Sequence, residues 1–282
     1  MRHGFRYTLA VAVAAAGTIG GGGLALAATI TDDDGGHRLV GTNDADVINA
    51  AGGADRVFAH QGDDQVNAGW GRDLVRAGLG NDTVNGERGR DRLFGGAGDD
   101  TLNGGPGRDR IFGMLGNDTI DGGTWRDRIF GGAGDDQIEG GFGRDLISGG
   151  FGNDTSRGGP GRDRIFANQG VDETFGGDGN DDLWALSRKD VAPGPNGEVD
   201  QTGDTLHGEG GDDLIRTRDG EVDRVDCGPG NDQARLDLVD VIADATPENP
   251  NGSCETVIRR APKPRDTRTE DQQQSAEDNG SQ

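Results

Sequence analysis

The chain has too few apolar and aromatic residues to form an ordinary hydrophobic core. Only 30% of its 282 residues are hydrophobic, and 5% are aromatic. A chain of this composition is expected to remain disordered unless a bound ligand contributes folding free energy. Catalytic signatures are missing too, because neither H-E-x-x-H nor G-x-S-x-G occurs and only four histidines are present. The composition therefore argues against an enzyme.

Positive charge is also scarce. Lys and Arg together number 28 against 51 Asp and Glu, which gives a formal net charge of −23. This sign of charge makes nucleic acid an unsuitable partner, because its phosphate backbone attracts basic proteins. After residue 28 no apolar segment is long enough to span a bilayer. We therefore expect no membrane span, and a ligand that supplies positive charge.

Glycine is abundant, with 55 residues, and most of it belongs to a nine-residue repeat. The repeat fills Gly41 to Trp184 in sixteen copies without an insertion or deletion. Its pattern is Gly-Gly-x-Gly-x-Asp-x-aliphatic-x, which is clearest from Gly95 to Asn103. Position 6 is Asp in all sixteen copies, position 4 is Gly in fourteen, and position 8 is Ile, Val or Leu in fourteen. Such regularity predicts a solenoid.

Each position of the repeat has a physical role. Small residues at positions 1, 2 and 4 allow backbone turns with positive φ and leave room for a close ligand. Positions 7 to 9 can form a short strand in which position 8 points inward and its neighbours point outward. Position-6 aspartates stacked along such a solenoid repel one another. A hard cation with oxygen ligands, calcium, relieves the repulsion, and turn carbonyls can complete its shell.

The repeat resembles the RTX, or haemolysin-type, calcium-binding nonapeptide repeat. The resemblance covers about half the chain. It implies an all-β parallel β-roll, a β-solenoid in which two nonapeptides form one coil and calcium ions lie between the turns of successive coils. It also implies ligation by the position-6 Asp side chains and by main-chain carbonyls of the glycine turns. If each ion bridges copies n and n+2, sixteen copies hold at most fourteen ions.

The predicted calcium ligands are the position-6 aspartates of the sixteen copies and two equivalent aspartates further along. They are Asp46, Asp55, Asp64, Asp73, Asp82, Asp91, Asp100, Asp109, Asp118, Asp127, Asp136, Asp145, Asp154, Asp163, Asp172, Asp181, Asp213 and Asp232.

Position 5 independently supports an 18-residue coil, because its residue type alternates from copy to copy. Arg90, Asp99, Arg108 and Asn117 illustrate the alternation, so the two halves of a coil differ chemically. An Arg beside the ligand Asp could pair with it in place of calcium. Alternatively its side chain points away and calcium binds in both rows, which we favour. Trp125 at a turn-glycine position, and Val171 with Thr174, are expected to weaken their local sites.

The outward faces of the two predicted sheets differ. One carries a Phe/Arg face with Phe58, Phe94, Phe112, Phe130 and Phe166 at position 9 and Arg56, Arg92, Arg110, Arg128 and Arg164 at position 7. These side chains could stack on one another along the sheet, or dock an envelope, matrix or self-association partner. The other is a Thr/Asn face that includes Thr83, Thr101, Thr119, Asn67 and Asn85. It could be a solvated surface or an ice- or glycan-binding surface.

Residues 1–27 have the pattern of a secretory signal peptide, followed by a lead-in linker over 28–40. Arg2 and Arg6 precede an apolar segment from Leu9 to Ile19, and Ala25-Leu26-Ala27 is a typical cleavage site. A membrane anchor is the weaker alternative, because the apolar segment is short and is followed by a glycine run. We expect the mature chain to be secreted to the extracellular space.

The C-terminal third is less regular. Residues 185–203 are predicted to leave the solenoid as a loop, 204–260 to form degenerate repeats and a cap, and 261–282 to be a disordered tail. Cys227 and Cys254 are the only cysteines and lie 27 residues, or three repeat lengths, apart. In an exported protein a disulfide between them is expected. It would close the cap.

Taken together, these features predict a secreted, non-enzymatic protein that folds into a β-roll on binding multiple calcium ions. Outside the repeats the chain has no segment with the length of a catalytic domain. A structural or surface-interaction role is the preferred interpretation. The alternative is an ice- or glycan-binding solenoid that uses the Thr/Asn or the Phe/Arg face.

Overall fold

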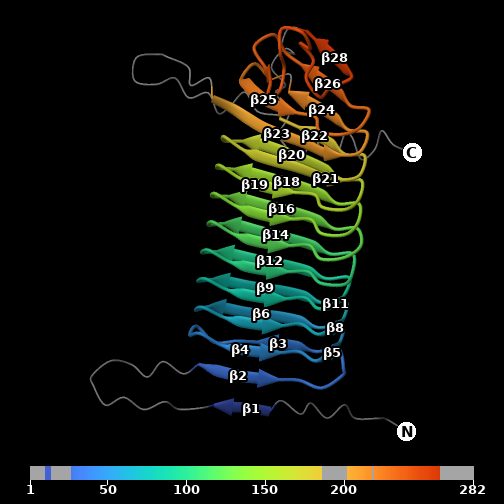
Figure 1. Ribbon diagram of the computed structural model, residues 1–282. Helices are drawn as coiled ribbons and strands as arrows, with labels where there is room; N and C mark the ends of the chain where they lie inside the picture. Colours follow the sequence, from blue (N-terminus) through green and yellow to red (C-terminus); the bar gives the residue numbers. More distant parts are fainter. Residues whose placement is uncertain (1–9, 14–26, 186–201, 218, 261–282) are drawn as a thin grey trace, which may run out of the picture.

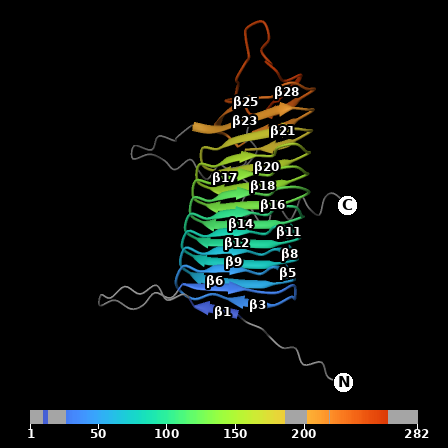
Figure 2. The same ribbon diagram turned by 60° about the horizontal axis from the view of Figure 1, so that its bottom comes forward.

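The computed structural model describes residues 10–13, 27–185, 202–217 and 219–260, which form a parallel β-solenoid (Figure 1). Successive coils stack along one axis, with β3 near one end and β28 near the other (Figure 2). The predicted all-β roll with two strands per coil is confirmed. Within the described ranges no helix is present that has the length and apolar character needed to cross a membrane.

Each coil contributes one strand to each of two sheets. Sheet A has 13 strands within the described ranges. In spatial order they are β1 (Ala10–Val13), β2 (Ala28–Thr31), β4 (Val47–Asn49), β7 (Gln65–Asn67), β10 (Thr83–Asn85), β13 (Thr101–Asn103), β15 (Thr119–Asp121), β17 (Gln137–Glu139), β19 (Thr155–Arg157), β21 (Glu173–Asp178), β23 (Thr202–Gly210), β25 (Val222–Asp226) and β27 (Val241–Ile242).

Sheet B contains the strands of the other half-coil, 12 of them in the described part of the chain. In spatial order they are β28 (Thr256–Arg259), β26 (Gln233–Leu236), β24 (Leu214–Thr217), β22 (Asp182–Trp184), β20 (Arg164–Gln169), β18 (Leu146–Phe151), β16 (Arg128–Ala133), β14 (Arg110–Leu115), β12 (Arg92–Ala97), β9 (Leu74–Leu79), β6 (Arg56–Gln61) and β3 (Arg38–Val40).

The pairing register confirms the 18-residue coil. Thr83 pairs with Thr101 and Leu93 pairs with Ile111, so equivalent positions of successive coils face each other in both sheets. Sheet A strands in the regular region have three residues, as predicted from positions 7 to 9. Sheet B strands often have six, because they continue into the next glycine turn, where Gly96 pairs with Met114. A small third sheet pairs β5 (Gly52–Gly53), β8 (Trp70–Gly71) and β11 (Arg88–Gly89) across the opposite turns.

The core is a narrow double column of position-8 side chains. Val84, Leu93, Ile111 and Ile129 are fully buried, whereas the position-7 and position-9 residues beside them are partly or fully exposed. The predicted inward and outward alternation is therefore confirmed. Each coil adds only two aliphatic side chains to this column, so apolar burial per residue stays small.

The Phe/Arg face packs against itself, as one of the two interpretations predicted. Phe94, Phe112 and Phe130 stack with ring centroids 4.9 and 5.0 Å apart and interplanar angles of 5°. Arg76, which occupies the same column, places its guanidinium 5.8 Å from the ring centroids of Phe58 and Phe94. These contacts half-bury the rings. Docking of a partner on this face stays a prediction.

The two ends of the solenoid differ from its middle. At the N-terminal end β1 pairs antiparallel with β2, whereas every other strand pair among the described residues is parallel. Apart from β1, residues 1–26 of the predicted signal peptide lie outside the described residues, as do nearly all of the 185–203 excursion and the 261–282 tail. At the C-terminal end β23 to β28 extend both sheets.

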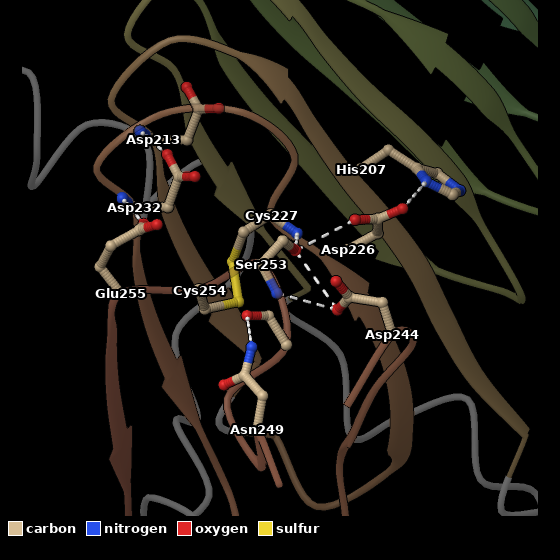
Figure 3. The surroundings of a disulfide bond; sticks show 11 residues. His207, Asp213, Asp226, Cys227, Asp232, Asp244, Asn249, Ser253, Cys254 and Glu255 are labelled. Atoms are coloured by element: carbon tan, nitrogen blue, oxygen red, sulfur yellow. Dashed lines mark hydrogen bonds and ion pairs between the residues drawn. A yellow bond between two sulfur atoms is a disulfide. The ribbon is translucent and has the colours of Figure 1, made fainter. Parts of the chain in front are cut away.

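The predicted disulfide is confirmed. Cys227 and Cys254 are bonded and almost fully buried, with Cα atoms 5.2 Å apart. Around them Ser253 Oγ accepts a hydrogen bond from the Cys227 N–H at 3.0 Å and contacts Asp226 Oδ1 at 3.2 Å (Figure 3). The bond therefore ties the segment that precedes β28 to the end of β25.

Candidate metal centres along the turns

The position-6 aspartates form two columns, one at the start of each sheet's strands. Row A comprises Asp46, Asp64, Asp82, Asp100, Asp118, Asp136, Asp154 and Asp172. Row B comprises Asp55, Asp73, Asp91, Asp109, Asp127, Asp145, Asp163 and Asp181. The structure thus brings together, coil on coil, the residues that the sequence placed at one position of the repeat.

One carboxylate oxygen of each aspartate is used by the fold. The Asp82 N–H donates to Asp100 Oδ1 at 2.8 Å, and the Asp100 N–H donates to Asp118 Oδ1 at 2.8 Å. The same bond recurs along both rows with a separation of 18 residues. Each Asp therefore presents Oδ1 to the coil before it and its own N–H to the coil after it.

The second oxygen, Oδ2, is buried and has no hydrogen-bond partner in most of these residues. It points into its own glycine turn, since a Cβ built on Gly95 would lie 2.2 Å from Asp100 Oδ2 and one on Gly113 would lie 2.1 Å from Asp118 Oδ2. The aspartates with such an oxygen are Asp55, Asp64, Asp73, Asp82, Asp91, Asp100, Asp109, Asp118, Asp127, Asp136, Asp145, Asp154, Asp163, Asp181, Asp213 and Asp232.

Burial makes these carboxyl groups unfavourable as bare anions. Loss of solvent raises the pKa of Asp100 to about 7, although the Asp82 N–H that bonds to it lowers the pKa and the neighbouring row-A carboxylates raise it further. In row B, burial likewise raises the pKa of Asp91 and Asp127 to about 8. At neutral pH the columns therefore require protons or cations.

Main-chain oxygens line the same space between successive turns. Gly98 and Gly116, at position 4, have φ values of 128° and 125°, which L side chains rarely adopt. A Cβ on Gly98 would lie 2.2 Å from the Gly80 carbonyl oxygen of the preceding coil. A Cβ on Gly95 would lie 2.9 Å from the Gly113 carbonyl oxygen as well as 2.2 Å from Asp100 Oδ2, so glycine at this position keeps open a space that a carbonyl oxygen and the unpaired carboxylate oxygen both border. A set of donors made only of oxygen fits calcium.

Position 5 distinguishes the two rows. In row A the side chain of Asn81 or Asp99 accepts a hydrogen bond from the N–H one coil later, as in Asp99 N–H to Asn81 Oδ1 at 3.0 Å and Asn117 N–H to Asp99 Oδ1 at 2.8 Å. In row B, Arg90 and Arg108 occupy this position and are exposed. Within the described ranges, no ion pair joins a position-5 Arg to a position-6 Asp. The positive charges of Arg126, Arg144 and Arg162 still act on row B, because they lower the pKa of Asp145, Asp163 and Asp181, in which burial is the larger effect and raises the pKa.

The first carboxylate of row A is an exception. Asp46 Oδ1 accepts from the Ala28 N–H at 2.6 Å, and Asp46 Oδ2 accepts from the Thr42 N–H at 2.6 Å. The Thr42 hydroxyl also donates to this carboxylate, at 3.0 Å to Oδ1. Protein groups therefore satisfy both oxygens, which sets Asp46 apart from the other predicted ligands.

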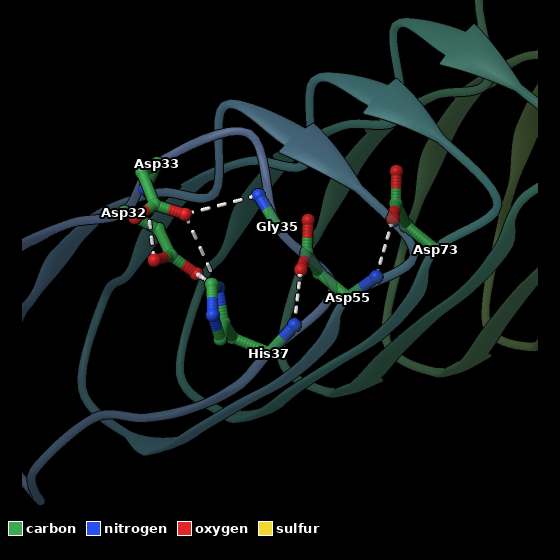
Figure 4. A network of polar contacts seen from close by, with 6 residues as sticks. All are labelled: Asp32, Asp33, Gly35, His37, Asp55 and Asp73. Carbon is green, nitrogen blue, oxygen red and sulfur yellow. Dashed lines mark hydrogen bonds and ion pairs between the residues drawn. The ribbon is translucent and has the colours of Figure 1, made fainter. Parts of the chain in front are cut away.

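Row B begins with a different cap, which Figure 4 shows from close by. The His37 N–H donates to Asp55 Oδ1 at 2.7 Å, and the Asp55 N–H donates to Asp73 Oδ1 at 2.7 Å. The His37 ring nitrogen Nδ1 lies 2.8 Å from Asp32 Oδ2. His37 in the lead-in segment thus donates to Asp55 the hydrogen bond that the preceding aspartate donates elsewhere in row B.

Both rows continue beyond the regular repeats through residues that the sequence analysis did not assign as ligands. The Asp204 N–H donates to Asp223 Oδ1 at 2.8 Å, and the Asp223 N–H donates to Asp240 Oδ1 at 3.4 Å. In row B the Asp232 N–H donates to Glu255 Oε2 at 2.7 Å (Figure 3). Asp204, Asp223 and Asp240 each begin an Asp-x-aliphatic triplet like those of the repeat. They are spaced 19 and 17 residues apart instead of 18, so they do not align with a strict nine-residue count.

The degenerate turn at Trp125 keeps the column intact. Trp125 stands where fourteen copies have glycine, adopts a φ of 86°, and is 64% exposed. Asp127 is nevertheless completely buried, and its N–H donates to Asp145 Oδ1 at 2.7 Å. Weaker ion binding at this turn, and at Val171, stays a prediction.

Comparison with known families identifies the repeat. The model of the RTX calcium-binding nonapeptide repeat matches residues 40–75, 67–102, 76–111, 94–124, 112–147, 126–156, 148–183 and 200–234. These matches cover more than half of the chain, which therefore belongs to this family of calcium-binding repeat proteins. The matches reach both aspartate rows, and the aligned columns are consistent with several calcium sites.

Other comparisons are less informative. A search of curated proteins found no match. Among solved structures, the chain is similar to a hyperactive, Ca2+-dependent, β-helical antifreeze protein from an Antarctic bacterium, with 16% identity and a TM-score of 0.41. The alignment covers 82% of this chain and 95% of that one. A similarity at this level implies nothing about activity.

Proposed function

We propose that the chain is a secreted, non-enzymatic protein whose β-roll folds when calcium binds between its turns. The observation that supports this most directly is the pair of buried aspartate columns in which one carboxylate oxygen after another lacks a hydrogen-bond partner. Calcium would neutralise the columns and add the folding free energy that the narrow core cannot provide. Secretion is supported by the signal-like residues 1–27 and by the disulfide.

In this proposal each residue type of the repeat has one task. The position-6 aspartates from Asp46 to Asp181, with Asp213 and Asp232, would hold the ions through carboxylate oxygens, together with main-chain carbonyls at the glycine turns. The glycines keep the space open, and the position-8 aliphatics align successive strands. Asp46 is the weakest of the proposed ligands, because Thr42 and Ala28 already satisfy its carboxylate.

The proposal is tested by far-UV circular dichroism of the chain, titrated separately with calcium and magnesium. We expect a cooperative gain of β-structure with calcium in the range of about 0.1–1 mM, typical of extracellular modules, and little gain with magnesium. A chain that is fully β-structured in chelator and unaffected by calcium would contradict the proposal.

Ice binding is a second candidate, supported by one feature of sheet A. Thr83, Thr101 and Thr119 pair in register on the outward surface of adjacent strands, and Asn67 Nδ2 donates to Asn49 Oδ1 at 2.8 Å in the neighbouring column. An ice-recrystallisation assay of the calcium-loaded chain tests it. Inhibition that Thr101→Tyr abolishes and Arg92→Tyr, on sheet B, preserves would support ice binding. No inhibition by the unmodified chain would exclude it.

A further inference from the structure

One turn near the C-terminal end departs from the repeat in its chemistry. The turn that leads to Asp223 has Asp219 and Glu221 four and two residues before the column aspartate. In regular copies these two positions are the glycines of the turn, such as Gly96 and Gly98 before Asp100. Two carboxylates therefore stand where the repeat otherwise offers only main-chain oxygens.

The carboxylates of this turn converge. Oxygens of Asp219, Glu221 and Asp223 all lie within 4.8 Å of one another, and the three side chains are 4%, 3% and 0% exposed. The backbone supports the arrangement, since the Glu221 N–H donates to Asp219 Oδ1 at 3.1 Å. Three acidic groups gathered at this distance in a buried turn repel one another strongly.

Two further carboxylates approach from the following loop. The Asp223 N–H donates to Asp240 Oδ1 at 3.4 Å, and the Thr217 hydroxyl donates to Asp240 Oδ2. The Asp237 N–H also donates to Asp240 Oδ2, at 2.7 Å. The charges of Asp237 and Asp240 act on Asp219, which places this loop beside the turn.

An independent observation indicates a missing ligand. Oδ2 of Asp223 and Oδ2 of Asp237 are buried and have no hydrogen-bond partner, and both residues are 0% exposed. Oδ1 of Asp223 already accepts the Asp204 N–H at 2.8 Å. The nearby Arg259 donates to main-chain carbonyls of Asp237 and Asp240, at 3.4 and 2.9 Å. Two fully buried carboxylate oxygens thus lack the hydrogen bonds that buried polar groups normally make.

We propose that the carboxylates of Asp219, Glu221 and Asp223 bind a calcium ion at a site that differs in kind from the repeat turns. Side-chain oxygens replace the glycine-turn carbonyls as ligands there, and Asp237 borders the site from the adjoining loop. The converging groups contain neither His nor Cys, so a hard, oxygen-binding cation fits best. Calcium accepts many carboxylate oxygens in irregular geometry, whereas magnesium retains water and demands octahedral ligands.

Site-resolved hydrogen exchange of the full chain tests the proposal. We expect calcium to protect amides of segment 219–240, and the double variant Asp219→Asn/Glu221→Gln to raise the calcium concentration for half-protection there by about tenfold or more. Turns around Asp100 should respond as in the unmodified chain. The matched control, Asp121→Asn/Glu139→Gln, removes the same charges from the exposed surface of sheet A and should leave both segments unchanged.

Equal calcium dependence of segment 219–240 in the double variant and the unmodified chain would overturn the proposal. If the variant does not fold, crystals of the unmodified chain grown in calcium decide the matter. An anomalous difference peak among the three carboxylates supports the site, and its absence at a well-ordered turn contradicts it. Peaks at this turn without peaks in the repeat turns would contradict the proposed function and leave this inference intact.

Discussion

At the scale of single residues, the aspartate at position 6 carries two opposing demands. Its Oδ1 completes the backbone bonding between coils, while its Oδ2 is left buried in the turn. Asn can accept the bond between coils through its single side-chain oxygen, but an NH2 group would then take the place of Oδ2 and could not ligate a cation. Structure and ion binding can therefore be separated by an isosteric substitution.

Asp100→Asn provides this separation. We expect the variant to need several-fold more calcium to fold, because one carboxylate ligand is lost. In chelator it should be as stable as the unmodified chain or more so, because a buried charge is removed. Calcium titration followed by circular dichroism measures both effects. Asp99→Asn is the control, since Asn already occupies position 5 at Asn81 and Asn117; an equal shift in this variant would refute the assignment.

A second residue-scale prediction concerns the space that glycine preserves. Gly98→Ala should destabilise the calcium-loaded roll by roughly 1–3 kcal/mol, through strain at a φ of 128° and contact with the Gly80 carbonyl. Gly52→Ala is the matched control, because its nearest neighbour to a new Cβ, Asp34 Oδ1, is 3.3 Å away and its φ is not in the strained range. Thermal unfolding in saturating calcium compares the two. Similar losses in both variants would mean that the turn tolerates a side chain.

At the scale of strands, two hydroxyl residues interrupt the aliphatic core column in the described part of sheet A. Ser156 pairs with Ile138 on one side and with Thr174 on the other, so two hydroxyl residues follow each other along the interior of sheet A. Both are almost fully buried, and neither hydroxyl has a hydrogen-bond partner. Parallel strands usually bury continuous aliphatic residues, so this segment is expected to be the weakest part of the column.

Thr174→Val should therefore stabilise the roll by about 1 kcal/mol, because it keeps the side-chain shape and removes a buried, unpaired hydroxyl. Thr119→Val makes the same chemical change on the exposed surface of sheet A and should have little effect. Denaturant unfolding of the calcium-loaded chains measures the difference. A stability loss in Thr174→Val would show that the hydroxyl has a partner in solution.

The strands and the coil length could be predicted where the nine-residue pattern repeats, but local departures from the pattern could not. Alternation along positions 7 to 9 indicated which side chains form the core, and the alternation of Arg90 and Asp99 indicated the coil length. The extra three residues of the sheet B strands were missed, because Gly96 and Ala97 carry no strand signal of their own. The hydrogen bonds that Thr42 donates to the Asp46 carboxylate were also not predicted, because they depend on a local turn at the first copy.

The missed column members have another cause. Asp204, Asp223 and Asp240 keep the Asp-x-aliphatic signature, yet the residues between them no longer match the nine-residue count. Strand pairing determines which residues of successive coils align. A turn can therefore be one residue longer or shorter while the strand that follows keeps its pairing. A search for the triplet alone would have found these residues, and with them the acidic turn at Asp219.

For the whole molecule, the raised carboxyl pKa values predict opposite pH responses with and without calcium. Burial raises the pKa of Asp100 to about 7 and of Asp154 to about 8, from an ordinary value of 3.8. Without calcium the folded chain binds protons more tightly than the unfolded chain. The resulting stability is fully present below about pH 3.8 and is lost as the pH rises through 6 to 8.

Circular dichroism in chelator should therefore show more β-structure at pH 5 than at pH 8. In calcium the trend reverses, because protons compete with the ion for the same oxygens and affinity falls as the pH drops. A chain in chelator whose β-structure increases with pH between 5 and 8 would contradict the buried, ion-free columns.

The 18-residue hydrogen-bond ladder has one more consequence, for how such a chain can change length. Removing one complete coil would join aspartates of the same row, and Arg, Asn and aliphatic columns would all remain continuous. Removing nine residues would instead splice row A onto row B, place Arg against Asn at position 5, and exchange the Thr and Phe surfaces beyond the junction. The coil is thus the unit by which the chain can gain or lose length. We expect related chains of different length to differ by multiples of two repeats.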